Sequence, residues 1–234
     1  MPDSSKSFLE MLKEFIRKLL ELIFSKVPKP ESHEYVEMGD GLKWATCNIG
    51  ASKPEEYGEY IAWGELEPYY STLNPLTWKQ GKETGYDFQT NRYIHKKYTV
   101  EDGKMVLEPL DDAARVRWGG SWRIPTGQEW ERLIDQKNFT WTYTIKEGVP
   151  GFTVTSKIKG YEGNQIFLPE AHCIIYFNWI EAPMGRYWSS SPLRVEDRFP
   201  GSDIYARAMF FEDGRVQVFQ GGRGDGFCIR PVSD

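Results

Sequence analysis

The sequence predicts an α+β domain, in which two helices pack on twisted antiparallel sheets, with an added N-terminal helix. Two segments in the middle of the chain carry helix-start signals, and the segments after them alternate apolar and polar residues as strands do. Helices that precede a set of antiparallel strands are typical of the α+β class. A separate amphipathic segment before a proline-containing linker at 28–33 predicts the added helix.

The N-terminal segment, residues 7–27, has the pattern of an amphipathic helix. Ser7 and Glu10 have the spacing of a capping box, and Pro28 ends the helical pattern. The apolar stripe is too wide to face water alone. Three roles remain open: docking on the main domain, homo-oligomerisation through near-heptad spacing, or lying in a membrane interface.

The linker divides the chain into two parts. Residues 1–30 form the predicted amphipathic helix, a tether or oligomerisation element, and residues 31–234 form the main domain. Within the main domain, residues 66–100 are polar, aromatic and irregular, which indicates an excursion from the core fold.

Two helices are predicted inside the main domain. The first, at 111–118, begins on acidic residues and ends at a pair of glycines. The second begins at Thr126, where Glu129 completes another capping box. From residue 139 onward the pattern is that of strands, beginning with the strict alternation of 139–145.

Composition and spacing exclude several classes of function. The formal net charge of -5 argues against a nucleic-acid partner, because proteins that bind phosphate backbones usually carry a basic field. No run of 18 apolar residues is present to span a membrane, and charged residues interrupt the N-terminal segment, so no signal peptide is visible. The 3 Cys and 3 His lack the spacing of a disulfide framework or a metal site. We therefore predict no cofactor, no metal and no catalytic residue.

Several sequence blocks carry a resemblance to a known superfamily. The blocks are Gly41–Gly50, Tyr57–Glu65, Gly119–Trp130 (Gly-Gly-Ser-Trp-Arg-Ile-Pro-Thr-Gly-Gln-Glu-Trp), Ile166–Pro169, Tyr187–Ser191 and Gly226–Val232. In this order they resemble the branch of the C-type-lectin-like superfamily that contains formylglycine-generating enzymes, the variable proteins of diversity-generating retroelements and a paralogous domain common in gut Bacteroidetes and their phages. The resemblance covers about 35–232 and implies a C-type-lectin-like fold.

Within this superfamily, the chain is most similar to the variable proteins. A calcium-dependent lectin would carry Glu-Pro-Asn or Gln-Pro-Asp together with Trp-Asn-Asp, and none of these occurs. A formylglycine-generating enzyme needs paired cysteines, but Cys228 has no cysteine near it in sequence. The resemblance implies a non-enzymatic recognition protein, at a cell surface or on a virion, whose residues near the C-terminus are diversified. An oxidase-like enzyme and a structural surface or virion component remain as alternatives.

The alternation of residue types in the C-terminal segment also predicts a binding face. Residues 204–211 and 215–219 are two alternating runs, and we interpret Glu212-Asp213-Gly214 between them as a three-residue hairpin loop. That register places Arg, Phe, Met and Gln side chains on one face and small apolar side chains on the other. Arg and aromatic residues are enriched at protein interfaces, where Lys is depleted. The alternative is that Phe211 and Phe219 pack beneath a neighbouring loop.

We therefore predict a ligand-binding surface made of this face and the loops on either side of it, at 192–203 and 220–225. The expected partner is a protein or a cell-surface glycan. The predicted ligand-binding residues are Arg194, Glu196, Arg198, Arg207, Met209, Phe211, Arg215, Gln217, Phe219, Gln220, Arg223 and Asp225.

Overall fold

The computed structural model describes most of the main domain. The described residues are 33–68, 86–87, 92–93, 97–99, 102–175, 178–180, 184–193, 196, 202–212 and 214–234. The predicted N-terminal helix, residues 7–27, lies outside these residues, as do Arg194, Arg198 and most of the predicted excursion at 66–100.

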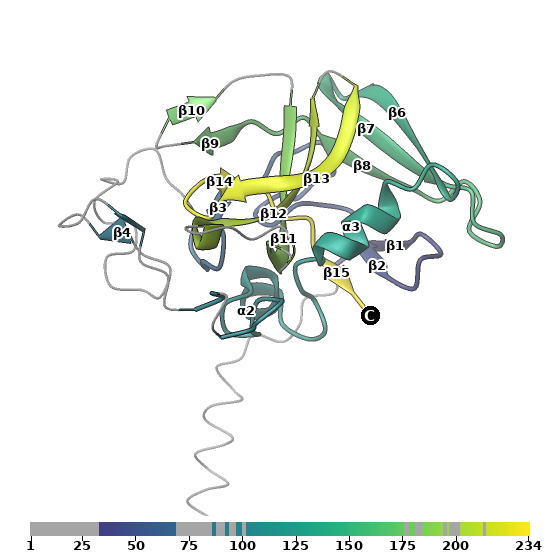
Figure 1. Ribbon diagram of the computed structural model, residues 1–234. Helices are drawn as coiled ribbons and strands as arrows, with labels where there is room; N and C mark the ends of the chain where they lie inside the picture. Colours follow the sequence, from purple (N-terminus) through teal and green to yellow (C-terminus); the bar gives the residue numbers. More distant parts are fainter. Residues whose placement is uncertain are drawn as a thin grey trace, which may run out of the picture.

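The described part of the chain is mostly β, so the predicted α+β class is wrong. It contains fifteen strands but only two α-helices, of 6 and 7 residues (Figure 1). The strands form five small sheets, each with two to four strands. Because each helix has no more than two turns, contacts between sheets supply much of the core.

Both helices nevertheless begin at the predicted signals. Helix α2 (Ala113–Trp118) is capped by the side chain of Asp112, which accepts the backbone N–H of Arg115. Helix α3 (Gly127–Leu133) has a complete capping box between Thr126 and Glu129. Among the described residues, no helix is long and apolar enough to cross a membrane.

Two small sheets join distant parts of the sequence. Strands β1 (Tyr35–Glu37), β2 (Lys43–Ala45) and β15 (Val232–Ser233) form one sheet, so both ends of the main domain meet in it. The other sheet has the order β10-β9-β14-β3. Its strands are β3 (Ile61–Ala62), β9 (Cys173–Ile175), β10 (Asn178–Ile180) and β14 (Gly226–Phe227), and β4 (Tyr86–Asp87) pairs separately with β5 (Arg92–Tyr93).

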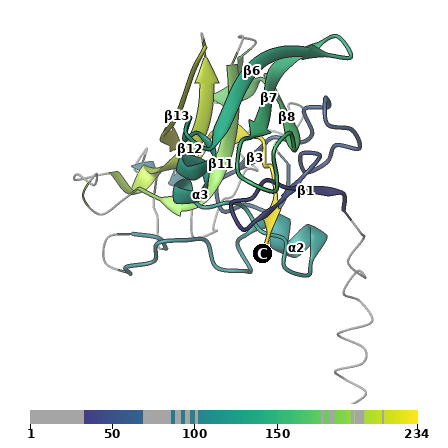
Figure 2. The same cartoon turned by 90° about the vertical axis from the view of Figure 1, so that its right-hand side faces the viewer.

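Two larger sheets are built from consecutive strands. The threonine-rich sheet contains β6 (Phe139–Lys146), β7 (Val149–Ser156) and β8 (Gln165–Pro169), in that order. The C-terminal sheet contains β11 (Met184–Pro192), β12 (Tyr205–Glu212) and β13 (Arg215–Gly222), with the short 3-10 helix η3 (Ser202–Ile204) before β12. Figure 2 shows the two sheets beside each other, and helix α3 contacts all three strands of the C-terminal sheet.

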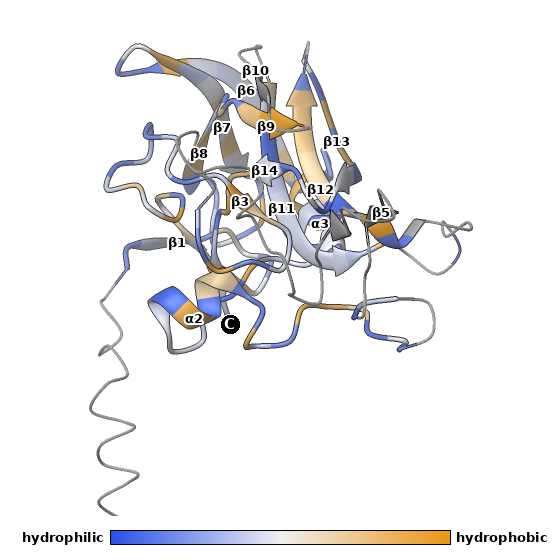
Figure 3. Cartoon of the chain, turned by 90° about the vertical axis from the view of Figure 1, so that its left-hand side faces the viewer, coloured by the Kyte–Doolittle hydropathy of each residue, from blue (hydrophilic) through white to orange (hydrophobic). Residues whose placement is uncertain are grey.

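The C-terminal sheet lies between two hydrophobic clusters. Tyr187, Met209 and Phe211 belong to the first cluster, together with Trp130 of α3. Trp188 of the same sheet belongs to the second, which also contains residues of β9 and β14. In the hydropathy colouring, β9 is apolar, while α2 carries both apolar and hydrophilic residues (Figure 3). Each face of the C-terminal sheet is therefore covered over at least part of its length.

Candidate functional site

The β12–β13 hairpin closes with a two-residue loop, so the predicted three-residue loop is wrong. Glu212 pairs with Arg215, and Phe211 pairs with Val216. Gly214 has a φ of 75°, and the Asp-Gly dipeptide of the sequence is a preferred pair for such tight loops. Because side chains alternate along a strand, this shift by one residue changes which residues of β12 and β13 share a face.

Three predicted binding residues of β12 consequently face the interior. Met209 and Phe211 are 0% exposed, and Phe211 packs against the ring of Phe152 on β7 with centroids 4.9 Å apart. Arg207 is also buried, and its guanidinium lies against Gly127 and pairs with Glu131 of α3. The predicted exposure of Arg207, Met209 and Phe211 is therefore wrong, since these residues attach the C-terminal sheet to α3 and to the threonine-rich sheet.

The three predicted binding residues of β13 are exposed. Arg215, Gln217 and Phe219 all reach solvent, and 53% of Phe219 is exposed. The observed register places them on one face with Phe210 of β12, which pairs with both Gln217 and Arg186 of β11. We call these five residues the outer patch: Arg186, Phe210, Arg215, Gln217 and Phe219.

Ring contacts connect three residues of the outer patch, Arg186, Phe210 and Phe219. Phe210 and Phe219 meet edge to face with centroids 5.7 Å apart. The guanidinium of Arg186 lies 5.5 Å from the centroid of Phe210 and 5.6 Å from that of Phe227. The Nε–H of Arg186 also points at the sulfur of Met184, 3.2 Å away. Contacts between guanidinium groups and aromatic faces are favourable, so these side chains are held in one arrangement.

Beyond the outer patch, the same face of the C-terminal sheet is covered by other side chains of the protein. Trp188 stacks on Phe227 with centroids 4.3 Å apart, and Gly221 packs so closely that a Cβ would overlap the Phe227 ring. Ala206 and Ala208 are buried there. The outer patch is thus the open end of a face whose remainder is core.

The segment predicted as a loop at 220–225 contributes little exposed surface, and its first three residues belong to β13. Arg223 is buried, with its guanidinium 4.5 Å from the Trp63 ring and donating to the backbone oxygens of Tyr205 and Tyr98. Its predicted place on the ligand-binding surface is therefore wrong. Gln220 and Asp225 are half-buried, and Asp225 accepts the backbone N–H of Gly222.

The loop at 192–203 is described only in part. Glu196 is exposed, whereas Arg194 and Arg198 lie outside the described residues. The place of these two arginines on the ligand-binding surface stays a prediction.

Sequence reasoning missed Arg186 and Phe210. A three-residue loop places Phe210 on the face opposite to Phe219, and Arg186 immediately precedes the block Tyr187–Ser191 that carries the resemblance. The available signal was the Asp-Gly pair at 213–214, which favours a two-residue loop and would have placed Phe210 beside Phe219.

A pocket of about 170 Å³ lies beside α2, away from the outer patch. It includes Asp112 and Arg123, and both are already engaged in the protein. Asp112 accepts backbone N–H groups from Arg115 and Ile124, and Arg123 pairs with Glu129 at 2.8 Å. Burial raises the pKa of Asp112, although the backbone donors oppose this effect. The pocket is smaller than typical ligand pockets, and its charged groups serve the fold.

Two of the three cysteines, Cys173 and Cys228, are buried. Cys47, Cys173 and Cys228 are free thiols. Burial raises the pKa of Cys173 to about 11 and raises that of Cys228 further above its ordinary value. Such thiols stay protonated at neutral pH, whereas the thiolate is the nucleophile. The described residues also contain no group of three or more His, Cys, Asp or Glu that could hold a metal ion.

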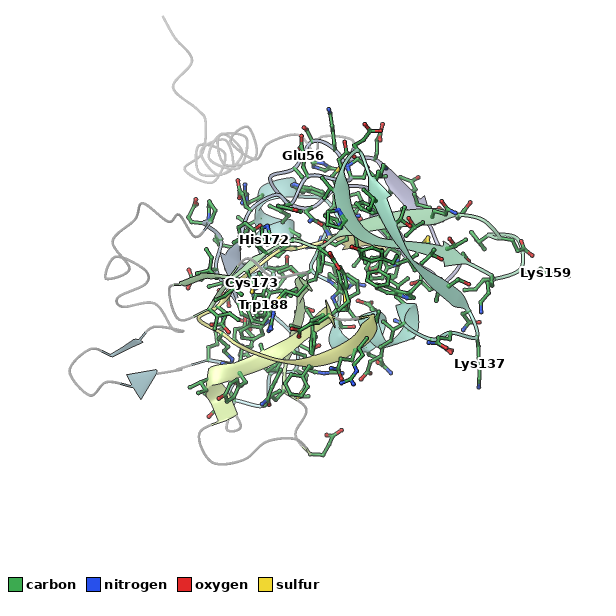
Figure 4. The ribbon with its side chains drawn as sticks, turned by 90° about the horizontal axis from the view of Figure 1, so that it is seen from above. Glu56, Lys137, Lys159, His172, Cys173 and Trp188 are labelled. Atoms are coloured by element: carbon green, nitrogen blue, oxygen red, sulfur yellow. The ribbon has the colours of Figure 1, made fainter. Side chains whose placement is uncertain are left out.

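Figure 4 shows which of the labelled side chains lie in the interior and which lie at the periphery. His172, Cys173 and Trp188 lie in the middle of the fold, whereas Lys137 and Lys159 project outward beside the threonine-rich sheet. The sulfur of Cys173 lies 3.8 Å from that of Met184, and Cys228 donates to the backbone oxygen of Tyr57 at 3.1 Å. These contacts are those of packed interior thiols.

Comparison with known proteins finds no relative of this chain: no family model, no curated protein and no solved structure matches it.

Proposed function

We propose that this chain is a non-enzymatic recognition protein that binds a partner protein through the outer patch of its C-terminal sheet. The observation that carries the proposal is Phe219, an aromatic side chain that is 53% exposed on a sheet whose other large apolar residues are mostly covered. Large aromatic residues and Arg dominate the binding energy of protein interfaces. The resemblance of the sequence to variable recognition proteins supports the same proposal.

The composition of the patch favours a protein ligand. It contains two Phe, two Arg and one Gln and lacks Lys, which matches the enrichment and depletion seen in interface cores. The rings offer an apolar surface, and the guanidinium of Arg186 can bind a carboxylate of a partner, whereas Arg215 lies directly opposite Glu212 of this chain. The proposed partner therefore presents an apolar side chain flanked by Asp or Glu.

The patch is also organised before binding. Its residues lie on three hydrogen-bonded strands, and Arg186 is fixed between two rings and a sulfur. A side chain that is already ordered loses less conformational entropy when a partner binds. The protonated buried thiols further support a binding role over the oxidase-like alternative.

The test uses the full chain as bait for a displayed library of random peptides, with a glycan array probed in parallel. We expect the selected peptides to combine apolar and acidic residues. Phe219→Ala should weaken their binding by about 30-fold, the loss typical of an interface hot spot. Arg186→Gln should weaken it as well, because it removes a guanidinium that contacts two rings.

The matched control is Tyr161→Ala, which truncates another exposed aromatic residue in the turn between β7 and β8. It should leave peptide binding unchanged. The proposal fails if the selected peptides bind both patch variants as well as they bind the unmodified chain. It fails equally if only glycans bind.

A further inference from the structure

Strand β6 is an unprotected edge of the threonine-rich sheet. It is first in the order β6-β7-β8 and pairs with β7 alone among the described strands. Its sequence, Phe-Thr-Trp-Thr-Tyr-Thr-Ile-Lys, has one charge, at its end, and its pairing with β7 runs without a bulge. Proteins normally protect edges with inward charges, Pro or bulges, because an unpaired edge is a template for another strand.

Hydrogen bonds around β6 identify the residues that point to the free edge. The backbone oxygen of Asn138 accepts from the N–H of Lys157 at 2.8 Å, so even-numbered residues bond toward β7. The backbone oxygen of Pro150 accepts from the N–H of Glu170 at 2.8 Å and therefore points away from β6. Ile145, which lies opposite Pro150, thus makes no backbone hydrogen bond to it. Antiparallel strands alternate strictly between these two kinds of pair.

It follows that Trp141, Tyr143 and Ile145 direct their backbone N–H and C=O groups to the free edge. In the described part of the chain, no other strand pairs with this edge. The edge is open to solvent on both faces: Tyr143 and Ile145 are 55% and 67% exposed on one face, and Thr140 and Thr142 are exposed on the other.

We infer that this edge pairs with the same edge of a second copy of the chain, antiparallel and across a two-fold axis beside Tyr143. In this register Tyr143 meets its own counterpart. Trp141 meets Ile145 of the second copy, and Ile145 meets Trp141. Every residue that points to the free edge thereby finds a partner, and the two sheets become one continuous sheet of six strands.

The side chains fit the same register. Tyr143 and Ile145 gain aromatic neighbours across the axis and Trp141 gains a β-branched one, and such pairs stabilise sheets. On the other face Thr142 lies opposite Thr144, and Thr140 lies opposite Lys146, so no like charges meet. Other registers pair these residues less completely. If the axis lay beside Trp141, Ile145 would lie opposite residue 137, which precedes β6. If it lay beside Ile145, Trp141 would lie opposite residue 149, which belongs to β7. The strand is thus self-complementary in one register, which is what a two-fold interface requires.

The first test measures molar mass by light scattering and sedimentation. All proteins are full chains that also carry Leu12→Glu and Leu19→Glu, which disrupt the apolar stripe of residues 7–27 so that the mass reports on β6. We expect a dimer. Tyr143→Lys should give a monomer, because two ammonium groups would lie opposite each other. Tyr161→Lys, the matched change at an exposed tyrosine in a turn, should stay dimeric.

Near-ultraviolet circular dichroism checks that Tyr143→Lys keeps the native fold. A monomeric parent protein would overturn the inference. A folded Tyr143→Lys variant with the dimer's mass would overturn it as well.

The second test examines the register by disulfide formation. Hydrogen-bonded antiparallel neighbours have Cα atoms about 5.5 Å apart, within the range of a disulfide. Tyr143→Cys should therefore give a covalent dimer on mild oxidation. Two copies of Ile145→Cys lie about 14 Å apart in this register and should not cross-link. Equal cross-linking of both variants, or of neither, would contradict the proposed pairing.

Discussion

At the scale of single residues, Arg230 shows how a buried charge can serve the fold. The residue is 0% exposed, and its guanidinium donates to Asn48 and to the backbone oxygens of Ala45, Thr46 and Phe167 at 2.8–3.1 Å. Burial lowers the pKa of Arg230. The planar guanidinium supplies five donors in a fixed arrangement, which no other side chain reproduces. Arg230 therefore ties three separate segments together by hydrogen bonds alone.

We predict that Arg230→Met lowers the free energy of unfolding by about 3 kcal/mol or more. The substitution leaves several buried acceptors without a donor, and each such acceptor costs about 1–3 kcal/mol. Urea unfolding at neutral pH measures the loss. Arg215→Met, at an exposed position on β13, should change stability by about 0.5 kcal/mol or less. Equal effects of the two substitutions would show that the hydrogen bonds of Arg230 contribute little.

The hairpin shows how a single residue limits what the sequence can predict. Alternation correctly placed Arg215, Gln217 and Phe219 on the exposed face of β13. The loop length was wrong by one residue, and so the positions of Met209 and Phe211 on β12 were reversed from exposed to buried. Alternation defines two faces in each strand, but the turn decides which faces coincide.

At the scale of elements, helix α3 is held by a network that begins with its cap. Glu129 receives the backbone N–H of Thr126 at 2.7 Å and both guanidinium branches of Arg123 at 2.8 Å. Burial acts to raise the pKa of Glu129, but these hydrogen bonds outweigh it and hold the pKa below its ordinary value. The carboxylate form is therefore favoured in the folded protein.

This network predicts a stability that depends on pH. A carboxyl group with a lowered pKa in the folded state stabilises the protein above its unfolded pKa, about 4.3, and loses this contribution as the pH falls through the folded value. We expect Glu129→Gln to lower the free energy of unfolding by about 1 kcal/mol at pH 7. The difference from the unmodified chain should shrink as the pH is lowered toward about 3. Urea unfolding across this range measures it, and a difference independent of pH would contradict the assignment.

The elements themselves were partly predictable. Capping signals located the starts of both helices, and alternation located β6. Capping residues mark where a helix begins but not how much of the chain it occupies, and this is why the predicted fold class was wrong. The exposure of β6 as an edge could not be predicted either, since an edge strand and a central strand share the same alternation.

At the scale of the whole molecule, the C-terminal sheet connects the two hydrophobic clusters. Met209 and Phe211 pack on one side with α3 and the threonine-rich sheet, and Trp188 packs on the other with Phe227. The small sheets β1-β2-β15 and β10-β9-β14-β3 depend on pairs of strands far apart in sequence. Periodicity reports only local structure, so these pairings were beyond its reach.

Gly185 offers a test of how closely the sheets are joined. It lies on β11 directly opposite Phe211, and a Cβ at this position would overlap the Phe211 ring, which is itself pressed against Phe152 of the threonine-rich sheet. Because interiors are close-packed and strain is not easily relieved, Gly185→Ala should lower the free energy of unfolding by about 1–3 kcal/mol.

A double-mutant cycle separates this overlap from other effects of replacing a glycine. Phe211→Leu removes the ring that the new Cβ would meet, so the double variant should be more stable than the sum of the two single losses predicts. Urea unfolding of the four proteins gives a coupling energy of about 0.5–3 kcal/mol in that direction. Strict additivity would mean that the cost of Gly185→Ala arises elsewhere, and that the junction between the two sheets has room to adjust.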